Sequence, residues 1–206
     1  MTRPKVYDRA YFDKWYRGRR HAVWQRADLV RQVTFAVAAA EMVLAQPIAS
    51  VLDLGAGEGR WQPVLRRLRP GASYLGIDSS EWAVRRWGKA RNLRLGRIDQ
   101  ASHADIRGRY DLLIAADVLH YLPAESLRRA ARLIARHTGA VAYLPAFVPG
   151  DAMVGDRQEF QPRSAAAFRR VFTAAGLVEL GMALWTTKRW ARHLAALERP
   201  AAAGRF

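Results

Sequence analysis

The sequence predicts an α/β fold, a doubly wound and mostly parallel sheet with helices on both faces. Short apolar segments alternate with helical patterns from about residue 47 onward, the arrangement that builds parallel sheets. The first apolar segment runs directly into a glycine-rich turn at 55–59. Two later segments end in carboxylates, Asp78 and Asp99. A sheet of this kind binds its ligand beyond the carboxyl ends of its strands, where all of these residues fall.

The first expected elements follow the order helix, strand, helix, strand. Residues 27–45 are rich in Ala and predict a helix. Residues 50–55 predict a short buried strand that ends in glycine. The helix expected over 61–69 stops before the Pro70-Gly pair, which ends helices. Residues 73–78 predict the second strand.

The middle of the chain continues the alternation. Ser79 is a suitable N-cap for a helix that runs to about Lys89. The third strand, over 93–98, is interrupted by Arg and Gly, whereas the fourth, over 110–116, is strongly apolar. A helix that starts at Pro123 follows, because Pro fits the first turn of a helix.

The last third predicts two more strands. Residues 140–144 form the fifth, which leads into a long loop over 145–162. Ser164 caps a helix that ends near Gly176, and 177–185 is the sixth strand. Residues 187–197 look helical, so the sequence shows no seventh strand.

Length and composition predict one domain over residues 1–198. Within it, 1–46 form an N-terminal helical lid or cap and 47–198 the core, while 199–206 are expected to be a flexible tail. With no Cys, disulfides and thiolate metal sites are excluded, and no metal is expected. No apolar run approaches the roughly 18 residues of a membrane span, and the charged start lacks the apolar stretch of a signal peptide. We therefore expect a cytoplasmic protein without membrane contact.

The formal charge of +16 permits partners such as nucleic acid or an acidic substrate. However, 30 of the 34 cationic residues are Arg, and they are spread along the chain without forming one tail. Such a distribution favours a solvent-exposed surface that is rich in Arg because of the overall composition, over a surface dedicated to binding nucleic acid. Nucleic acid remains a possible partner that the sequence does not favour.

The residues around the glycine turn distinguish between classes of nucleoside ligand. The glycine spacing is G-x-G-x-G, which differs from the G-x-G-x-x-G of dinucleotide binders. Asp53 lies two residues before Gly55, where its carboxylate would repel a pyrophosphate. The same carboxylate suits a ligand with an ammonium and a sulfonium, and S-adenosylmethionine carries both. At the end of the second strand, Asp78 can accept hydrogen bonds from two ribose hydroxyls.

Four segments resemble the motifs of the class I, Rossmann-like methyltransferases. Residues 51–59 match the first motif closely and 75–80 the second, while 96–99 look like the third. Residues 110–123 are similar to the fourth motif in members that act on small molecules. The resemblance implies S-adenosylmethionine as cofactor and S-adenosylhomocysteine as product. One departure is the seventh, antiparallel strand that the family usually has and this sequence does not show.

By this resemblance the cofactor contacts the strand ends in a definite order. The glycine turn borders its methionine part, Asp78 holds the ribose, the third motif reads the adenine, and the end of the fourth strand faces the methionine amine. The candidate cofactor-binding residues are Asp53, Gly55, Ala56, Gly57, Asp78, Ser79, Asp99, Gln100, Ala115 and Ala116. The alternative is that Asp53 only organises the turn and Asp99 only caps a loop.

The candidate acceptor side is built from one histidine and several aromatic residues. His120 follows the fourth strand and is a candidate general base, although it could equally form a wall of the cofactor pocket or bind a backbone group. An aromatic N-terminal stretch predicts a lid over the pocket, the alternative being a helix that buries its aromatic residues on the sheet. The candidate substrate-binding residues are Tyr7, Tyr11, Phe12, Trp15, Tyr16, Tyr121, Phe147 and Phe160.

Four functions remain open at this point. The favoured one is an enzyme that transfers a methyl group by in-line displacement to an O, N or C atom of a small molecule. The second is a methyltransferase acting on RNA or another polymer, and the third a non-catalytic protein that binds S-adenosylmethionine. The fourth, a nicotinamide oxidoreductase, is disfavoured by Asp53 and the glycine spacing. The oligomeric state is left open.

Overall fold

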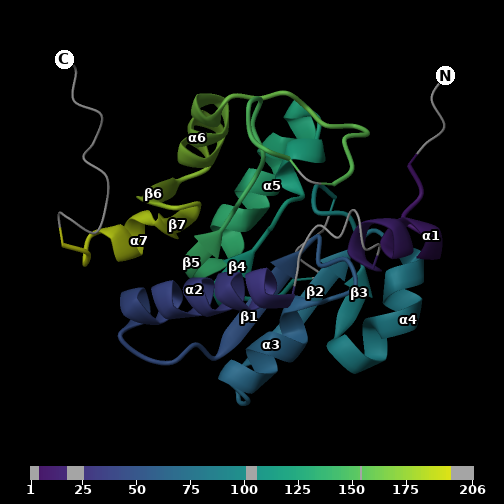
Figure 1. The fold of residues 1–206 in the computed structure, drawn as a ribbon. Coiled ribbons are helices and arrows are strands. Elements are labelled where there is room, and N and C mark those ends of the chain that lie inside the picture. Colours follow the sequence, from purple (N-terminus) through teal and green to yellow (C-terminus); the bar gives the residue numbers. More distant parts are fainter. Residues whose placement is uncertain (1–4, 18–25, 101–105, 154, 196–206) are drawn as a thin grey trace.

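The computed structural model describes residues 5–17, 26–100, 106–153 and 155–195, and in these ranges it contains one seven-stranded sheet (Figure 1). The strands are Ser50–Leu54 (β1), Ser73–Asp78 (β2), Leu93–Leu95 (β3), Tyr110–Ile114 (β4), Thr138–Tyr143 (β5), Leu177–Gly181 (β6) and Leu184–Thr187 (β7). Their order is β3-β2-β1-β4-β5-β7-β6. The first five pair in parallel, and β7 is antiparallel to both of its neighbours. The chain changes direction across the sheet between β1 and β4, which confirms a doubly wound topology.

Helices cover both faces of this sheet. Figure 1 shows two groups, with α2 and α3 below the strands and α5 and α6 above them. The main helices are α2 (Arg26–Leu44), α3 (Trp61–Leu68), α4 (Glu81–Arg91), α5 (Ala124–His137) and α6 (Ala165–Ala174). The shorter ones are α1 (Arg9–Phe12), which continues into a π-helical turn (Asp13–Arg17), a 3-10 turn (Leu119–Tyr121) and α7 (Lys188–Ala191).

The strands supply side chains to two separate cores. Successive strand residues point to opposite faces, so Leu113 of β4 packs beneath α5 and α6 while Leu112 and Ile114 pack beneath α2 and α3. All three are fully buried. Burial on both faces explains why the strands read as continuous apolar runs with little alternation.

Local signals at helix ends account for most of the boundaries. Ser164 caps α6 as expected, its Oγ accepting from the Ala167 amide at 3.2 Å. The N-cap of α4 is Ser80, which corrects the prediction of Ser79 by one position, and Ser80 Oγ accepts from the Ala83 amide at 3.0 Å. α4 then ends at Asn92, which adopts the left-handed conformation common after helices. β3 stops at Leu95 and is therefore shorter than expected.

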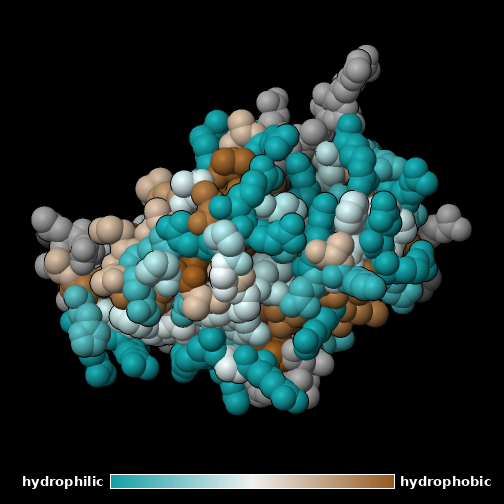
Figure 2. Space-filling view, turned by 90° about the horizontal axis from the view of Figure 1, so that it is seen from below, coloured by the Kyte–Doolittle hydropathy of each residue, from teal (hydrophilic) through white to brown (hydrophobic). Residues whose placement is uncertain are grey.

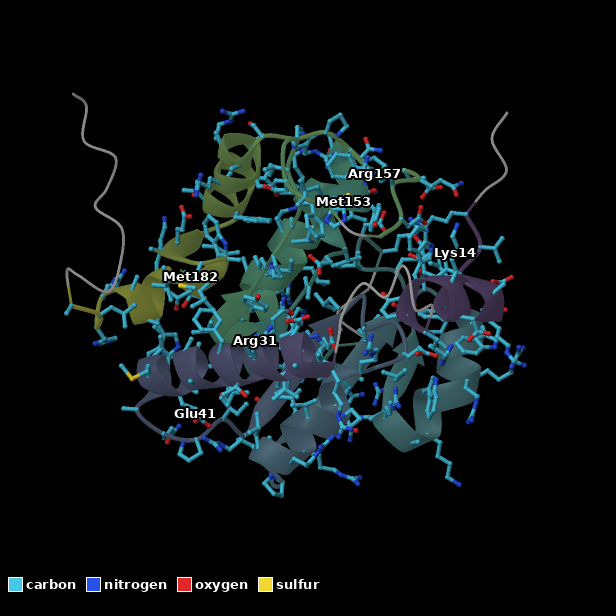
Figure 3. All side chains as sticks on the ribbon, in the orientation of Figure 1. Lys14, Arg31, Glu41, Met153, Arg157 and Met182 are labelled. Carbon is cyan, nitrogen blue, oxygen red and sulfur yellow. The ribbon has the colours of Figure 1, made fainter. Side chains whose placement is uncertain are left out.

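The sixth strand and the helix after it were predicted wrongly, since 177–187 form a β-hairpin. β6 and β7 are joined by Met182 and Ala183, which have φ values of 48° and 63°. Two central residues with positive φ make the tight turn that suits the twist of a hairpin. Met182 is labelled at this turn in Figure 3. A seventh strand therefore exists, and of the helix expected over 187–197 the described part, up to residue 195, contains only the four residues of α7.

Two further predictions concern the ends and the exterior of the molecule. The tail expected over 199–206 lies outside the residues that the structure describes. Within the described ranges, no helix combines the length and the apolar character needed to cross a membrane.

Candidate functional site

A cavity of about 530 Å³ lies at the carboxyl ends of β1, β2 and β4. Its volume falls within the range of small-molecule and cofactor sites. Two segments that are distant in sequence form its outer wall: residues 5–17, which we call the N-terminal cover, and residues 144–153 with 155–164, which we call the β5–α6 loop. The cavity therefore lies where the strand order reverses, as the sequence predicts.

The glycine turn forms the floor of this cavity. The amides of Gly55 and Ala56 both donate to the Ile77 carbonyl, at 2.8 and 3.1 Å, and so tie the turn to β2. Gly55 has φ +75°, and a Cβ there would lie 2.8 Å from Cγ2 of Val118. Only glycine meets both conditions, because other residues rarely adopt this backbone and would collide with Val118.

Asp78 projects from the end of β2 and is held in a fixed orientation. Its Oδ2 accepts from the Gly57 amide at 2.7 Å, and its Oδ1 from the Ser80 amide at 2.8 Å. Burial raises the pKa of Asp78, and these two backbone hydrogen bonds oppose the rise. A carboxylate oxygen has two lone pairs, so each oxygen keeps one available for a ligand hydroxyl.

Asp53 lies deeper, in β1, and is only 2% exposed. Its Oδ2 accepts from the Tyr74 hydroxyl at 2.7 Å. Burial raises the pKa of Asp53 to about 7; the Tyr74 hydrogen bond opposes this rise and the nearby Asp78 adds to it. The side chain is therefore balanced between its neutral and charged forms near neutral pH.

Asp99 lies in the wall after β3, paired with groups from two elements. Its Oδ2 accepts from the Ser126 hydroxyl at 2.7 Å, and its Oδ1 from Nε of Arg97 at 3.3 Å. Burial raises the pKa of Asp99, but Ser126 and Arg97 outweigh burial and hold it below its usual range. Asp99 is thus a charged carboxylate in the cavity wall, and its contacts join the third motif to α5.

The aromatic residues of the N-terminal cover face the cavity. All five that the sequence singles out contribute to the wall, namely Tyr7, Tyr11, Phe12, Trp15 and Tyr16. Phe12 is 2% exposed and stacks on Trp82 of α4 with ring centroids 5.2 Å apart. The Tyr7 carbonyl accepts from Ser80 Oγ at 2.5 Å. The cover is therefore attached directly to the cap of α4, next to Asp78.

Lys5 connects the N-terminal cover to the β5–α6 loop. Its Nζ lies 2.8 Å from Oδ2 of Asp156 and 4.1 Å from the centroid of the Tyr121 ring. The Lys5 side chain is only 4% exposed. In Figure 3, Lys14 of the cover and Arg157 of the loop are both labelled on the right of the molecule.

His120 is fully buried in the cavity wall. Its Nδ1 lies 3.3 Å from the Phe147 amide, which donates to it. Its ring packs against the rings of Tyr121, Phe147 and Phe160 at centroid distances of 4.2, 5.3 and 5.7 Å. Burial, and secondly the charge of Lys5, lower the pKa of His120 to about 4.

Most of the predicted site residues lie together in the cavity wall, and three do not. Gln100 is exposed, Ala115 is fully buried in the core under α5, and Phe160 packs behind His120. The wall also contains residues that the sequence interpretation missed: Lys5, Glu58, Arg60, Trp61, Arg97, Asp117, Asp156, Glu159 and Gln161. Arg60 and Trp61 directly follow the glycine turn, so their position in sequence could have revealed them. Lys5 and Asp156 are far apart in the chain, and no local pattern predicts that they meet.

The cavity is acidic although the chain is basic. Among the described residues, seven carboxylate side chains line it, against the three cationic side chains of Lys5, Arg60 and Arg97. The carboxylates are Asp53, Glu58, Asp78, Asp99, Asp117, Asp156 and Glu159. This excess of negative charge favours a ligand with positive charge.

The chain is similar in sequence to known methyltransferases. A family model described as a methyltransferase domain matches residues 17–178. Trans-aconitate 2-methyltransferase of Deinococcus radiodurans is 36% identical over 78 residues, which are 38% of this chain and 30% of that protein. The match thus spans under a third of that relative's length.

Several solved structures share the fold at low sequence identity. A sugar N-methyltransferase from Streptoalloteichus has a TM-score of 0.66 at 14% identity, covering 91% of this chain and 98% of that one. The magnesium protoporphyrin IX methyltransferase of Synechocystis, solved with bound S-adenosylmethionine, has a TM-score of 0.61 at 18% identity, covering 91% of this chain and all of that one. These likenesses show the fold.

Proposed function

The chain belongs to the methyltransferase-domain family and has the class I, Rossmann-like fold, and from this premise we propose that it transfers a methyl group from S-adenosylmethionine to a small-molecule acceptor. The observation that carries the proposal is Asp78, a carboxylate clamped by two backbone amides beside the glycine turn. When bound, the cofactor supplies a methyl group activated on a sulfonium.

The wall residues fit the parts of this cofactor. Asp78 keeps one lone pair on each oxygen for the two ribose hydroxyls. Gly55, Ala56 and Gly57 allow the backbone to approach the methionine part. Ser79 and Ala116 complete this side of the wall, and the acidic lining complements the positive charge of the ligand.

The adenine and the methionine amine are assigned to the remaining carboxylates. We assign Asp99 to the adenine amine, because its orientation is fixed by Ser126 and Arg97. Asp53 lies beneath the glycine turn, where its negative charge attracts the methionine ammonium. Gln100 is left out because it is exposed, and Ala115 acts only as a packed support behind Ala116.

The N-terminal cover and the β5–α6 loop supply the acceptor side. Methyl transfer from a sulfonium is an in-line displacement, so alignment of donor and acceptor is the main requirement. The aromatic rings of Tyr11, Tyr16, Tyr121 and Phe147 give this side rigid walls. Because both outer segments are short, the enclosed volume suits a small acceptor.

The central test is binding of the cofactor to the purified chain. We expect calorimetry to detect both S-adenosylmethionine and S-adenosylhomocysteine, and Asp78→Asn to weaken both about tenfold to a hundredfold, because it loses hydrogen bonds to a charged group. The matched control is Asp28→Asn, a substitution on the exposed side of α2 that should leave affinity unchanged. Absence of heat with either ligand at about millimolar concentration, from a protein that is folded by circular dichroism, would contradict the proposal.

A further inference from the structure

His120 presents a hydrogen-bond donor that the described protein leaves without a partner. Its Nε2 is buried and makes no hydrogen bond to any residue in the described ranges. The other ring nitrogen and the backbone are both engaged: Nδ1 accepts from the Phe147 amide, and the His120 carbonyl accepts from the Gln161 amide at 2.9 Å. The side chain is thus held in place by the β5–α6 loop, with one polar atom unsatisfied.

The hydrogen bond to Nδ1 determines which nitrogen carries the proton. A backbone N–H can only donate, so Nδ1 must offer its lone pair to Phe147. In the neutral ring the proton is then on Nε2. The pKa of about 4 keeps the ring neutral at physiological pH, since burial and the Lys5 ammonium both disfavour imidazolium. The titratable groups nearby include Tyr121, against the ring, and Asp156, which pairs with Lys5.

A buried N–H without an acceptor is costly, and a protein rarely keeps one without reason. His120 is one of the residues that line the cavity, so a ligand atom bound beside it there can supply the missing acceptor. The cofactor is assigned to the side of the glycine turn and Asp78, whereas His120 lies among the aromatic rings of the acceptor side. We propose that the acceptor carries an oxygen atom that accepts a hydrogen bond from Nε2–H of His120, so that His120 binds and orients the acceptor without removing its proton.

This proposal rests on the proposed function and replaces the general-base role expected from the sequence. A base would need a free lone pair, but Nδ1 already receives the Phe147 amide and Nε2 carries the proton. The acceptor class is accordingly a small molecule with a carboxylate, carbonyl or hydroxyl oxygen near the atom that is methylated. An acceptor whose only polar groups are ammonium groups would leave Nε2–H unsatisfied, because an ammonium also only donates hydrogen bonds.

The first experiment determines the tautomer without any knowledge of the acceptor. Nitrogen NMR of the histidine-labelled protein in complex with S-adenosylhomocysteine should show a protonated Nε2 and an unprotonated Nδ1 for His120, unchanged between about pH 6 and 8. The signals are assigned by their loss in His120→Gln. A proton on Nδ1, or titration of the ring within this range, would overturn the proposal. Failure of S-adenosylhomocysteine to bind would instead contradict the proposed function.

The second experiment tests the oxygen acceptor with simple probes. Acetate and acetamide, added to the same complex, should shift the Nε2–H signal of His120, whereas methylammonium should not. The two oxygen probes distinguish an anionic from a neutral acceptor. Equal shifts with methylammonium, or none with either oxygen probe up to the solubility limit, would overturn the proposal.

Two variants distinguish hydrogen-bond donation by His120 from packing of its ring. His120→Gln retains an N–H donor and His120→Leu does not, and both should keep the affinity for S-adenosylhomocysteine. We expect His120→Leu to bind the oxygen probe that shifts the wild-type signal about two- to tenfold more weakly, with His120→Gln closer to the wild type. Equal weakening in both variants, at unchanged cofactor affinity and melting temperature, would contradict a donor role.

Discussion

The raised pKa of the buried Asp53 predicts that the proposed binding of the cofactor depends on pH. Burial is the largest cause that raises the pKa of Asp53 to about 7, and the hydrogen bond from Tyr74 lowers the pKa and so limits this rise. A carboxylic acid with a raised pKa gains its charge as the pH rises through that value. The attraction between Asp53 and the cofactor's ammonium should therefore strengthen between about pH 6 and 8.

The Tyr74→Phe variant tests this dependence. Loss of the hydroxyl removes a hydrogen bond that lowers the pKa of Asp53, so the pKa should rise further and the gain in affinity should move to higher pH. At pH 7 we expect the variant to bind S-adenosylmethionine a few-fold more weakly than the wild type, and to recover above about pH 8. Calorimetry across this pH range measures the affinity for S-adenosylmethionine. Tyr110→Phe is the control, since Tyr110 lies at the amino end of β4. A parallel loss at every pH would show that Tyr74 acts through packing alone.

The position of the candidate cofactor residues at the cavity was predictable because their signals are local. Gly55, Gly57 and Asp78 lie within one strand–turn–helix–strand unit, and the amide of Gly57 donates directly to Asp78. Lys5 and Asp156 could not be found in this way, because their contact depends on how two distant segments meet in space. The tautomer of His120 could not be predicted from the sequence either, since it depends on a hydrogen bond from a backbone amide 27 residues away.

The N-terminal cover and the β5–α6 loop are joined by the Lys5–Asp156 pair. Both side chains are largely buried, 4% and 12% exposed, so the pair is shielded from the solvent that weakens ion pairs on the surface. The Tyr121 ring beneath Nζ adds a cation–π contact. This contact should hold the two outer segments together over the cavity.

We therefore expect Lys5→Met to loosen the cover while leaving the core intact. Amide hydrogen exchange over residues 7–17 should accelerate, and S-adenosylhomocysteine should dissociate several-fold faster, because opening of the cover no longer breaks a shielded ion pair. Lys14→Met is the matched control in the same segment, as Lys14 contacts Trp15 and, among the residues that the structure describes, forms no ion pair with a carboxylate. Unchanged exchange in Lys5→Met would mean that the aromatic contacts of Phe12 hold the cover on their own.

The β6–β7 hairpin was missed because its turn has unusual residues. A two-residue turn with both φ values positive normally contains Asn or Gly, and Met182 and Ala183 carry neither signal. The apolar residues around them, Leu180 before and Leu184 and Trp185 after, led to the prediction of one long strand. Most of the other strands were predictable, since they are apolar runs bounded by clear turn or helix signals, whereas β3, with an Arg at its centre, was predicted too long.

The same turn yields a prediction about stability. Met182 has φ 48° and is 77% exposed, so Met182→Gly should relieve backbone strain without loss of packing. We expect the free energy of unfolding to rise by about 0.5–1 kcal/mol. Met182→Val should lower it, because a β-branched residue tolerates this conformation poorly. Chemical denaturation of the two variants measures the difference, and equal values would show that the turn stores no strain.

At the scale of the whole molecule, negative and positive charge are separated. Among the described residues, seven acidic side chains line the cavity, whereas only three Lys and Arg side chains do. Figure 2, which views the molecule from below, shows hydrophilic residues distributed over the whole face, with hydrophobic ones in separate areas. A basic exterior can attract polyanions, but the acidic interior would repel their phosphates from the site of methyl transfer.

This separation predicts that nucleic acid binds the exterior weakly and without access to the site. A labelled single-stranded RNA should bind at low ionic strength and dissociate steeply as salt rises, because such binding depends on counterion release. S-adenosylhomocysteine should not compete with it, since the RNA binds the basic exterior and S-adenosylhomocysteine binds in the cavity. Fluorescence anisotropy at several salt concentrations, with and without S-adenosylhomocysteine, measures both effects. A submicromolar complex that resists physiological salt and responds to S-adenosylhomocysteine would identify RNA as the acceptor in place of a small molecule.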